Sequence, residues 1–142
     1  VQTCALPISC DAVDGLTART LAVQKGDSIL DAAISEIMAQ DNPPTALCFH
    51  QDSQAIPLFF RLQRSGLSVP GDISVTGFDD STFAKEAELT TVRQRPYDMA
   101  VDAAQKALAL IEGQPIEEPF ETFPVQLQVR NSTAKPRTAP LL

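Results

Sequence analysis

The chain has 142 residues, of which 44% are hydrophobic and 20% charged, as in a globular protein with a single core. Its formal net charge is -7 and its Lys and Arg residues do not cluster, so a basic face for binding nucleic acid is not expected. No apolar run is long enough to span a bilayer, which excludes a membrane-spanning role for these residues.

The N-terminal residues 1–19 are expected to be non-native or disordered. Residues 1–8 show neither a helical nor a strand period, and they lack the charged region and the cleavage site of a signal peptide. They look like the translation of a sequencing adapter, which implies a gene truncated on its 5′ side.

The cysteine content indicates a cellular compartment. Cys4, Cys10 and Cys48 are an odd number of cysteines without a secretory signal, which favours reduced thiols and a cytoplasmic protein. A zinc site needs four clustered ligands, so neither these cysteines nor the single His50 predict a metal, and no cofactor is expected.

Segments typical of strands and helices then alternate along the chain. Residues 20–24 predict a short strand, and Asp27 or Ser28 can cap the helix that follows. Residues 41–44 contain two prolines, which end that helix, and residues 45–50 predict an apolar strand buried on both sheet faces. The core-facing residues of the helix are expected to be Ile29, Ala32, Ala33, Ile37 and Met38.

A second strand and helix pair has clearer signals. Asp52 is predicted to cap a helix that ends at Gly66, with Pro57 removing one hydrogen bond near its start. A Pro-Gly turn leads into a strand at residues 73–78. The alternation with short links predicts an α/β fold with parallel strands and right-handed crossovers. The apolar positions of the helix are Ala55, Leu58, Phe59 and Leu62.

The C-terminal half is predicted to hold one long helix between two strands. Residues 81–88 are polar, and residues 90–93 form a short strand. The helix begins with Pro96 in its first turn and ends at Gly113, and residues 123–129 form the last strand. One face of the helix carries Ala100, Ala104, Ala107, Leu108 and Ile111.

Three ordered motifs carry a family resemblance. They are Val-Pro-Gly-Asp-Ile-Ser-Val-Thr-Gly-Phe-Asp-Asp at residues 69–80, Leu-Thr-Thr-Val-Arg-Gln at residues 89–94 and Val-Arg-Asn-Ser-Thr at residues 129–133. Together they resemble the effector-sensing domain of the LacI/GalR family of bacterial transcription regulators. The resemblance implies a type I periplasmic-binding-protein-like fold, whose two lobes close around a small effector, often a sugar. It also implies a homodimer that reads operator DNA through an N-terminal helix-turn-helix.

The resemblance places residues 20–135 mainly in the C-terminal lobe, followed by a loose tail at residues 136–142. The helix after Pro96 and a strand would then be isolated elements of the other lobe, whose sheet is not in this chain. The apolar side chains that are expected to stay exposed for this reason are Val101, Leu108, Leu110 and Ile111. Because each would forgo roughly 1.5–3 kcal/mol of burial, the chain is expected either to be marginally stable or to fold with this helix re-docked or mobile.

Asp79 is the main candidate for effector binding. It follows a buried strand, where open α/β sheets bind ligands, and a carboxylate can accept hydrogen bonds from two sugar hydroxyls. It also matches the family position that contacts the effector, although an aspartate here can instead cap the next turn. Three further residues are weaker effector candidates. Gln51 follows the other buried strand. Gln94 lies where the chain crosses between the two lobes, and it is expected either to contact the ligand or to form a hinge hydrogen bond. Ser28 aligns loosely with a family position that often carries an aromatic ring stacked on the effector.

The resemblance also predicts a dimer interface at Phe83 and Ala84, whereas Asp80 is expected to be a structural or interface residue. Adjacent carboxylates on a strand do not converge on one bond, and no nucleophile elbow or phosphate loop is present, so no enzyme is expected. The predicted function is effector sensing in a LacI-type regulator of transcription initiation. The alternative is a periplasmic sugar-binding protein of an ABC transporter, and a helix-turn-helix or a signal peptide upstream would discriminate between them.

Overall fold

A computed structural model describes residues 43–116 and 118–138, together with residues 32, 34–35, 38–39 and 41. The strand predicted at residues 20–24 lies outside the described residues. Within the first predicted helix, Ile34 is buried and Met38 packs against the core, whereas Ala32 is exposed. The prediction that Ala32 faces the core is therefore wrong, and Ile34 takes a core position that the sequence pattern had not indicated.

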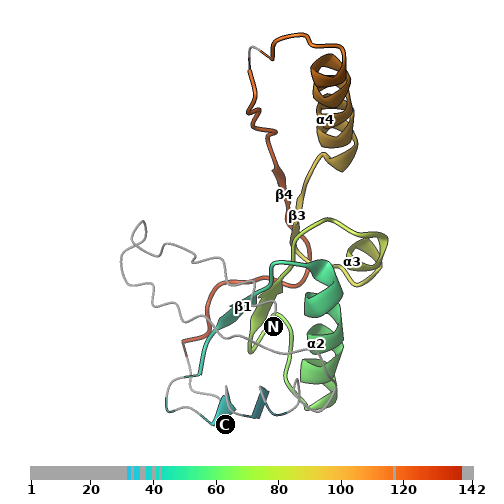
Figure 1. Cartoon of the computed structure of the whole chain (residues 1–142). Coiled ribbons are helices and arrows are strands. Elements are labelled where there is room, and N and C mark those ends of the chain that lie inside the picture. Colours follow the sequence, from blue (N-terminus) through green and yellow to red (C-terminus); the bar gives the residue numbers. More distant parts are fainter. Residues whose placement is uncertain are drawn as a thin grey trace.

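The main body is a βα-β unit with parallel strands, as predicted (Figure 1). β1 (Ala46–Cys48) leads into α2 (Asp52–Arg64), and the chain returns through β2 (Ser74–Thr76). The two strands pair in parallel with Leu47 opposite Val75. Each strand has three residues, so both are shorter than the apolar runs that predicted them.

The helix α2 follows the predicted pattern closely. Gly66 has φ +86, and this left-handed conformation lets its N–H bond to the carbonyl of Gln63 while the Leu67 N–H bonds to the carbonyl of Leu62 at 3.0 Å. This pair of bonds satisfies carbonyls that a helix end otherwise leaves free. All four predicted apolar positions are buried, namely Ala55, Leu58, Phe59 and Leu62.

The strand β1 is not covered on both faces, which corrects the prediction. Leu47 packs against the core, but Ala46 and Cys48 on the opposite face are exposed. An uninterrupted apolar run suggests burial on both sides only when the neighbouring layers are present, and the described residues supply one of them.

The chain after β2 forms a second small sheet on top of this body. The polar residues 81–88 contain a one-turn helix, α3 (Thr82–Glu86), that the sequence pattern had not indicated. β3 (Thr91–Arg93) pairs antiparallel with β4 (Gln126–Gln128), and a parallel bridge from Thr76 to Thr90 joins β3 to β2. Strand β3 therefore links the two small sheets.

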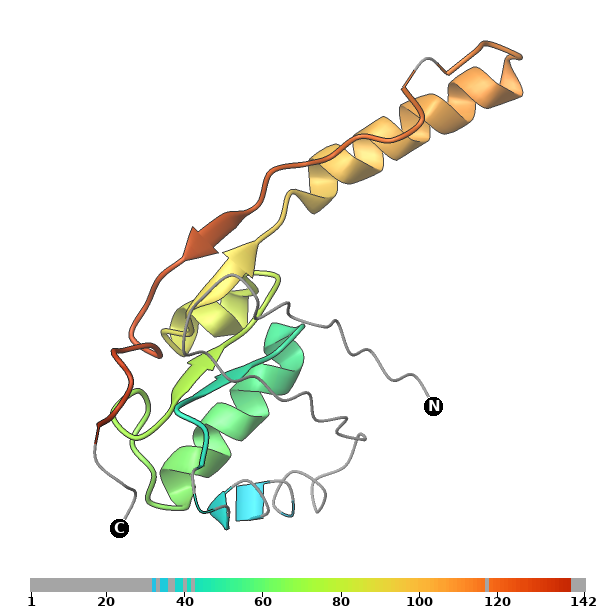
Figure 2. The ribbon, with the colours of Figure 1, turned by 90° about the vertical axis from the view of Figure 1, so that its left-hand side faces the viewer.

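The helix α4 (Pro96–Ile111) stands away from the body on β3 and β4 (Figure 2). It begins with Pro96 and ends before Gly113, which has φ +70, so the predicted limits are confirmed. None of its residues is buried, and the exposure that the sequence predicted for its apolar side chains is also confirmed. Residues 91–129, which hold β3, α4 and β4, are together called the arm here. Its large exposed apolar residues are Tyr97, Met99, Val101, Leu108, Leu110, Ile111, Phe120, Val125, Leu127 and Val129.

This exposure predicts that α4 opens far more easily than α2. A helix of this length without packing is marginal in water, whereas opening α2 disrupts the core. In native-state hydrogen exchange, the amides of α4 are expected to exchange at least about 100-fold faster than those of α2, relative to unstructured peptides. Equal protection of the two helices would contradict the prediction.

Arg137 is bound to the body, which corrects the expectation of a loose segment at this residue, whereas residues 139–142 of the predicted tail lie outside the described residues. The guanidinium of Arg137 donates to the carbonyls of Pro43 at 2.8 Å, Asp72 at 3.0 Å and Pro44 at 3.2 Å. These carbonyls precede β1 and β2 and lie outside the register in which the two strands pair. The five N–H groups of one arginine can serve several such carbonyls at once, and nothing in the local sequence signals this role.

Candidate functional site

The candidate site is built on the turn that follows β2, here called the exit turn (residues 77–81). Asp79 has φ 113 and Asp80 has φ 53, conformations that are uncommon for residues other than glycine. The Asp79 N–H donates to the carbonyl of Val92 at 2.9 Å, and the carbonyl of Phe78 accepts from the Asp52 N–H at 2.9 Å. The exit turn is thus fixed between the start of α2 and strand β3.

The structure brings two of the predicted site residues together. The side-chain amide of Gln94 donates from Nε2 to Asp79 Oδ1 at 2.9 Å. Asp79 is exposed, and among the described residues no hydrogen bond occupies its second carboxylate oxygen. The pair therefore presents an oriented carboxylate at the carboxyl end of the parallel sheet, where a ligand hydroxyl can donate to it.

The other two effector candidates have different outcomes. Gln51 is exposed and is the N-cap residue of α2, and the bond from Asp52 to Phe78 places it beside the exit turn. Its side chain has no bond to Asp79 among the described contacts, so its effector role stays a prediction. Ser28 lies outside the described residues.

Asp52 is not a helix cap, contrary to the prediction. It is the first residue of α2, and its carboxylate is buried with 1% of the residue exposed. Oδ2 accepts from the Ser81 N–H at 2.8 Å and Oδ1 accepts from the Thr91 hydroxyl at 2.6 Å. The carboxylate therefore joins α2 to the exit turn and to β3, instead of satisfying the first turn of its own helix.

Asp80 is the centre of an ion cluster, here called the Asp80 cluster, with Arg93, Arg130 and Lys85. Its side chain is only 2% exposed; Arg93 Nε donates to Oδ2 at 2.6 Å, Arg130 donates to Oδ1, and the Lys85 ammonium lies 3.9 Å away. Burial by itself raises the pKa of this carboxyl, but the hydrogen bonds and charges of the two arginines outweigh it and hold the pKa below 3.8. The expectation that Asp80 is structural agrees with these contacts.

A buried Ser and Thr network completes the support for the site. The Ser132 hydroxyl donates to the Val75 carbonyl at 2.6 Å and accepts from the Thr90 N–H at 2.8 Å. The Thr90 hydroxyl contacts the Thr133 hydroxyl at 2.9 Å. Thr90, Ser132 and Thr133 belong to the second and third family motifs. The motifs therefore marked these positions, although the sequence analysis assigned them no role.

The two predicted interface residues differ. Phe83 is 69% exposed and keeps a surface for a partner, whereas Ala84 is fully buried against the core. Ala84 therefore has no side-chain surface left for a partner, because α3 turns it inward. Its N–H, moreover, is held by the Ser81 hydroxyl at 3.2 Å.

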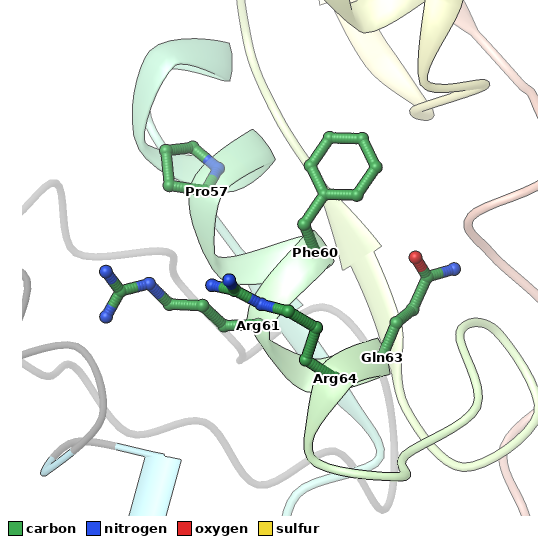
Figure 3. A pocket seen from close by; sticks show the side chains of 5 residues that line it. All are labelled: Pro57, Phe60, Arg61, Gln63 and Arg64. Atoms are coloured by element: carbon green, nitrogen blue, oxygen red, sulfur yellow. The ribbon is translucent and has the colours of Figure 1, made fainter.

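A surface hollow of about 510 Å³ lies elsewhere, along the outer face of α2 (Figure 3). It contains none of the predicted effector residues, and since a single helix face lines it, we do not assign it to the effector. Its lining residues are Pro57, Phe60, Arg61, Gln63 and Arg64.

Among the described residues, no group of three His, Cys, Asp or Glu side chains could hold a metal ion. In the same part of the chain, no helix is both long and apolar enough to cross a membrane.

A family model described as a periplasmic binding protein-like domain matches residues 7–133. Among curated proteins, the arabinose metabolism transcriptional repressor of Geobacillus stearothermophilus is 40% identical over 97 residues. That match covers 66% of this chain and 27% of the repressor, so the chain spans about a quarter of its relative's length.

Solved structures agree with this similarity. A LacI transcriptional regulator from a Rhodococcus species superposes with a TM-score of 0.64 at 32% identity, over 75% of this chain and 40% of the regulator. The transcriptional regulator CelR in complex with cellobiose superposes with a TM-score of 0.65 at 29% identity, over 74% and 33% of the two chains. Both solved structures are named as transcriptional regulators, and the first is named as a LacI regulator.

Proposed function

The chain belongs to the periplasmic binding protein-like domain family, as found in LacI/GalR-type transcription regulators, and we propose that it is part of such a regulator's effector-sensing domain. The proposed effector is a small molecule of the sugar class, and Asp79 is the group that binds it. The observation that carries the proposal is the exposed Asp79 carboxylate, which Gln94 orients at the carboxyl end of the parallel sheet.

The chemistry of this pair suits a polyhydroxylated ligand. An ionised carboxylate only accepts hydrogen bonds, and Gln94 can add an amide donor and an acceptor beside it. The arabinose repressor and the cellobiose complex of CelR are sugar-related regulators, which supports the same ligand class here. Gln51 lies beside the exit turn and is proposed as a further contact, and the loosely aligned Ser28 is proposed only as a secondary one.

The wider role follows from the family. The net charge of -7 supports sensing rather than DNA contact by these residues, so operator DNA is proposed to be bound by another part of a cytoplasmic regulator. A homodimer is proposed to form through the face that carries Phe83, with Phe60 on the neighbouring α2 also half-exposed. The similarity to regulators supports this role over that of a transport protein, and none of the proteins compared above is named as an enzyme.

The proposal predicts that Asp79→Asn abolishes sugar binding by the chain. Arabinose and cellobiose are titrated into the 15N-labelled chain, and shifts of the Asp79 and Gln94 signals are followed by NMR. Wild type is expected to respond to at least one sugar, whereas Asp79→Asn is not, because an amide nitrogen replaces one of the two accepting oxygens.

The matched control for this experiment is Glu86→Gln. It makes the same change from carboxylate to amide at an exposed position on α3, away from the exit turn. The control is expected to respond as wild type does. Sugar shifts that persist in Asp79→Asn would contradict the assignment of Asp79, and a wild-type chain that responds to neither sugar would count against the sugar class.

A further inference from the structure

The backbone of the exit turn is hydrogen-bonded at Asp79 and at the two residues that follow it, while the Asp79 carboxylate stays exposed. The Asp79 N–H is bound by Val92 O, the Asp80 N–H points at Thr91 Oγ1 at 3.4 Å, and the Ser81 N–H is bound by Asp52. Three consecutive amides are thus tied to β3 and α2, so the turn has little freedom to relax.

This turn is also strained. A non-glycine residue at φ 113, as at Asp79, lies outside the small left-handed region that side chains tolerate, so its backbone conformation is unfavourable. Strain of this kind persists only where surrounding contacts over-determine it. The strongest contacts next to Asp79 are the ion pairs of Asp80, because charge-assisted hydrogen bonds from two arginines reach an almost fully buried carboxylate.

We propose that Asp80, held by Arg93 and Arg130, is a positioning residue that keeps the neighbouring Asp79 carboxylate in its effector-binding orientation. The inference rests on the proposed function, since it assigns a role to the support of the same site. Asp80 itself faces inward and does not touch the ligand. Its effect reaches the site through the shared backbone of the exit turn and through the Asp79–Gln94 bond.

The two arginines that bind Asp80 lie at the base of the arm. Arg93 ends β3, which leaves the body toward α4, and Arg130 follows β4, which returns from it (Figure 1). Two consecutive acidic residues of the exit turn are thus hydrogen-bonded to two consecutive residues at the end of β3. Asp79 accepts from Gln94, and Asp80 accepts from Arg93. The position of the effector-binding carboxylate is therefore tied to both strands of the arm.

The test uses the ligand-free chain and the side-chain amide signal of Gln94 in 15N NMR spectra. Asp79→Asn defines where this signal lies when the charged acceptor is lost. Asp80→Asn keeps the side-chain shape but removes the charge that both arginines bind, and it is expected to shift the Gln94 signal toward its Asp79→Asn position. Arg93→Gln, at a half-exposed residue that leaves Arg130 in place, is expected to shift the signal the same way by less.

A role in stability alone would not move this signal in the folded chain. Arg137→Ala is the control, because it loses three hydrogen bonds at the opposite end of the strands and should lower stability without shifting Gln94. A Gln94 signal unchanged in folded Asp80→Asn overturns the inference; if that variant does not fold, an unchanged signal in Arg93→Gln does so. The Gln94 readout needs no sugar, so failure of wild type to bind arabinose or cellobiose counts against the proposed function alone.

Discussion

Replacing Arg130 by alanine is expected to lower the free energy of unfolding by about 3–5 kcal/mol, or to abolish the cooperative transition, in a urea titration followed by circular dichroism. The guanidinium is largely buried; it donates to Asp80 and, through Nη1, to the Leu89 carbonyl at 2.7 Å. Its removal leaves a buried carboxylate with fewer partners, and an unpaired buried charge costs more than the pair itself contributes.

Arg95→Ala is the matched control for this prediction. Arg95 pairs with Asp98 at the start of α4, but both side chains are well exposed, so the pair is screened by water. Its loss is expected to cost less than about 1 kcal/mol. Equal losses in Arg95→Ala and Arg130→Ala would show that the buried Asp80 cluster contributes no more than a surface pair.

The same experiment at low pH checks the origin of the effect. The pKa of Asp80 is lower in the folded chain than that of an ordinary aspartate, because the arginines outweigh the effect of burial. The stability from this group is therefore complete above an unfolded pKa of about 3.9 and is lost as the pH falls through the lower folded pKa. The difference between wild type and Arg130→Ala is expected to shrink in that acid range, and a constant difference would exclude the ion pair as its source.

Gly77→Ala is the second substitution with a large expected effect. A Cβ at this position would overlap Asp52 Oδ1 and would lie 3.0 Å from Leu89 Cδ2 and 3.3 Å from the Asp52 Cα atom. Relief requires Asp52 to move, which breaks its 2.6 Å bond from Thr91 inside the core. We expect a loss of about 3 kcal/mol in the free energy of unfolding, measured by urea denaturation, since overpacking and a lost charged hydrogen bond combine.

Gly71→Ala provides the comparison for Gly77→Ala. The added Cβ would lie 2.7 Å from Ser68 Oγ, which is the end of an exposed side chain that can rotate away. The expected loss is below about 1 kcal/mol. A similar loss of unfolding free energy in both variants would mean that the close packing around Gly77 does not exclude a side chain there.

Much of the helical structure could be predicted because its signals are local. The apolar spacing of α2 and the glycines that end α2 and α4 act within a few residues, so Gly66 and Gly113 were identified from the sequence alone. The proximity of Asp79 and Gln94 has a related reason: both residues follow strands, and parallel strands place their carboxyl ends at one edge, whereas the effector role of the two residues stays a prediction.

Other features depend on residues that are far apart in the chain. Asp52 was predicted to cap its helix from its position alone, but its partners are Ser81 and Thr91. Likewise, residues 136–142 read as a loose tail, although Arg137 binds carbonyls more than 90 residues away at Pro43 and Pro44. A carboxylate or a guanidinium can bind several kinds of partner, so its type indicates a capacity and not a particular contact.

Residue patterns alone therefore predicted the order and type of the main elements and the parallel pairing of β1 with β2, and the family resemblance predicted the exposure of α4. Hydrophobic periodicity and glycine conformation are short-range properties, and a linear pattern records them directly. By contrast, no sequence pattern indicated that Arg93 and Arg130 enclose Asp80, that Ala84 faces the core or that β3 pairs antiparallel with β4. Those outcomes depend on which distant segments meet when the core forms, because burial makes a polar group bind whichever partner the fold places beside it.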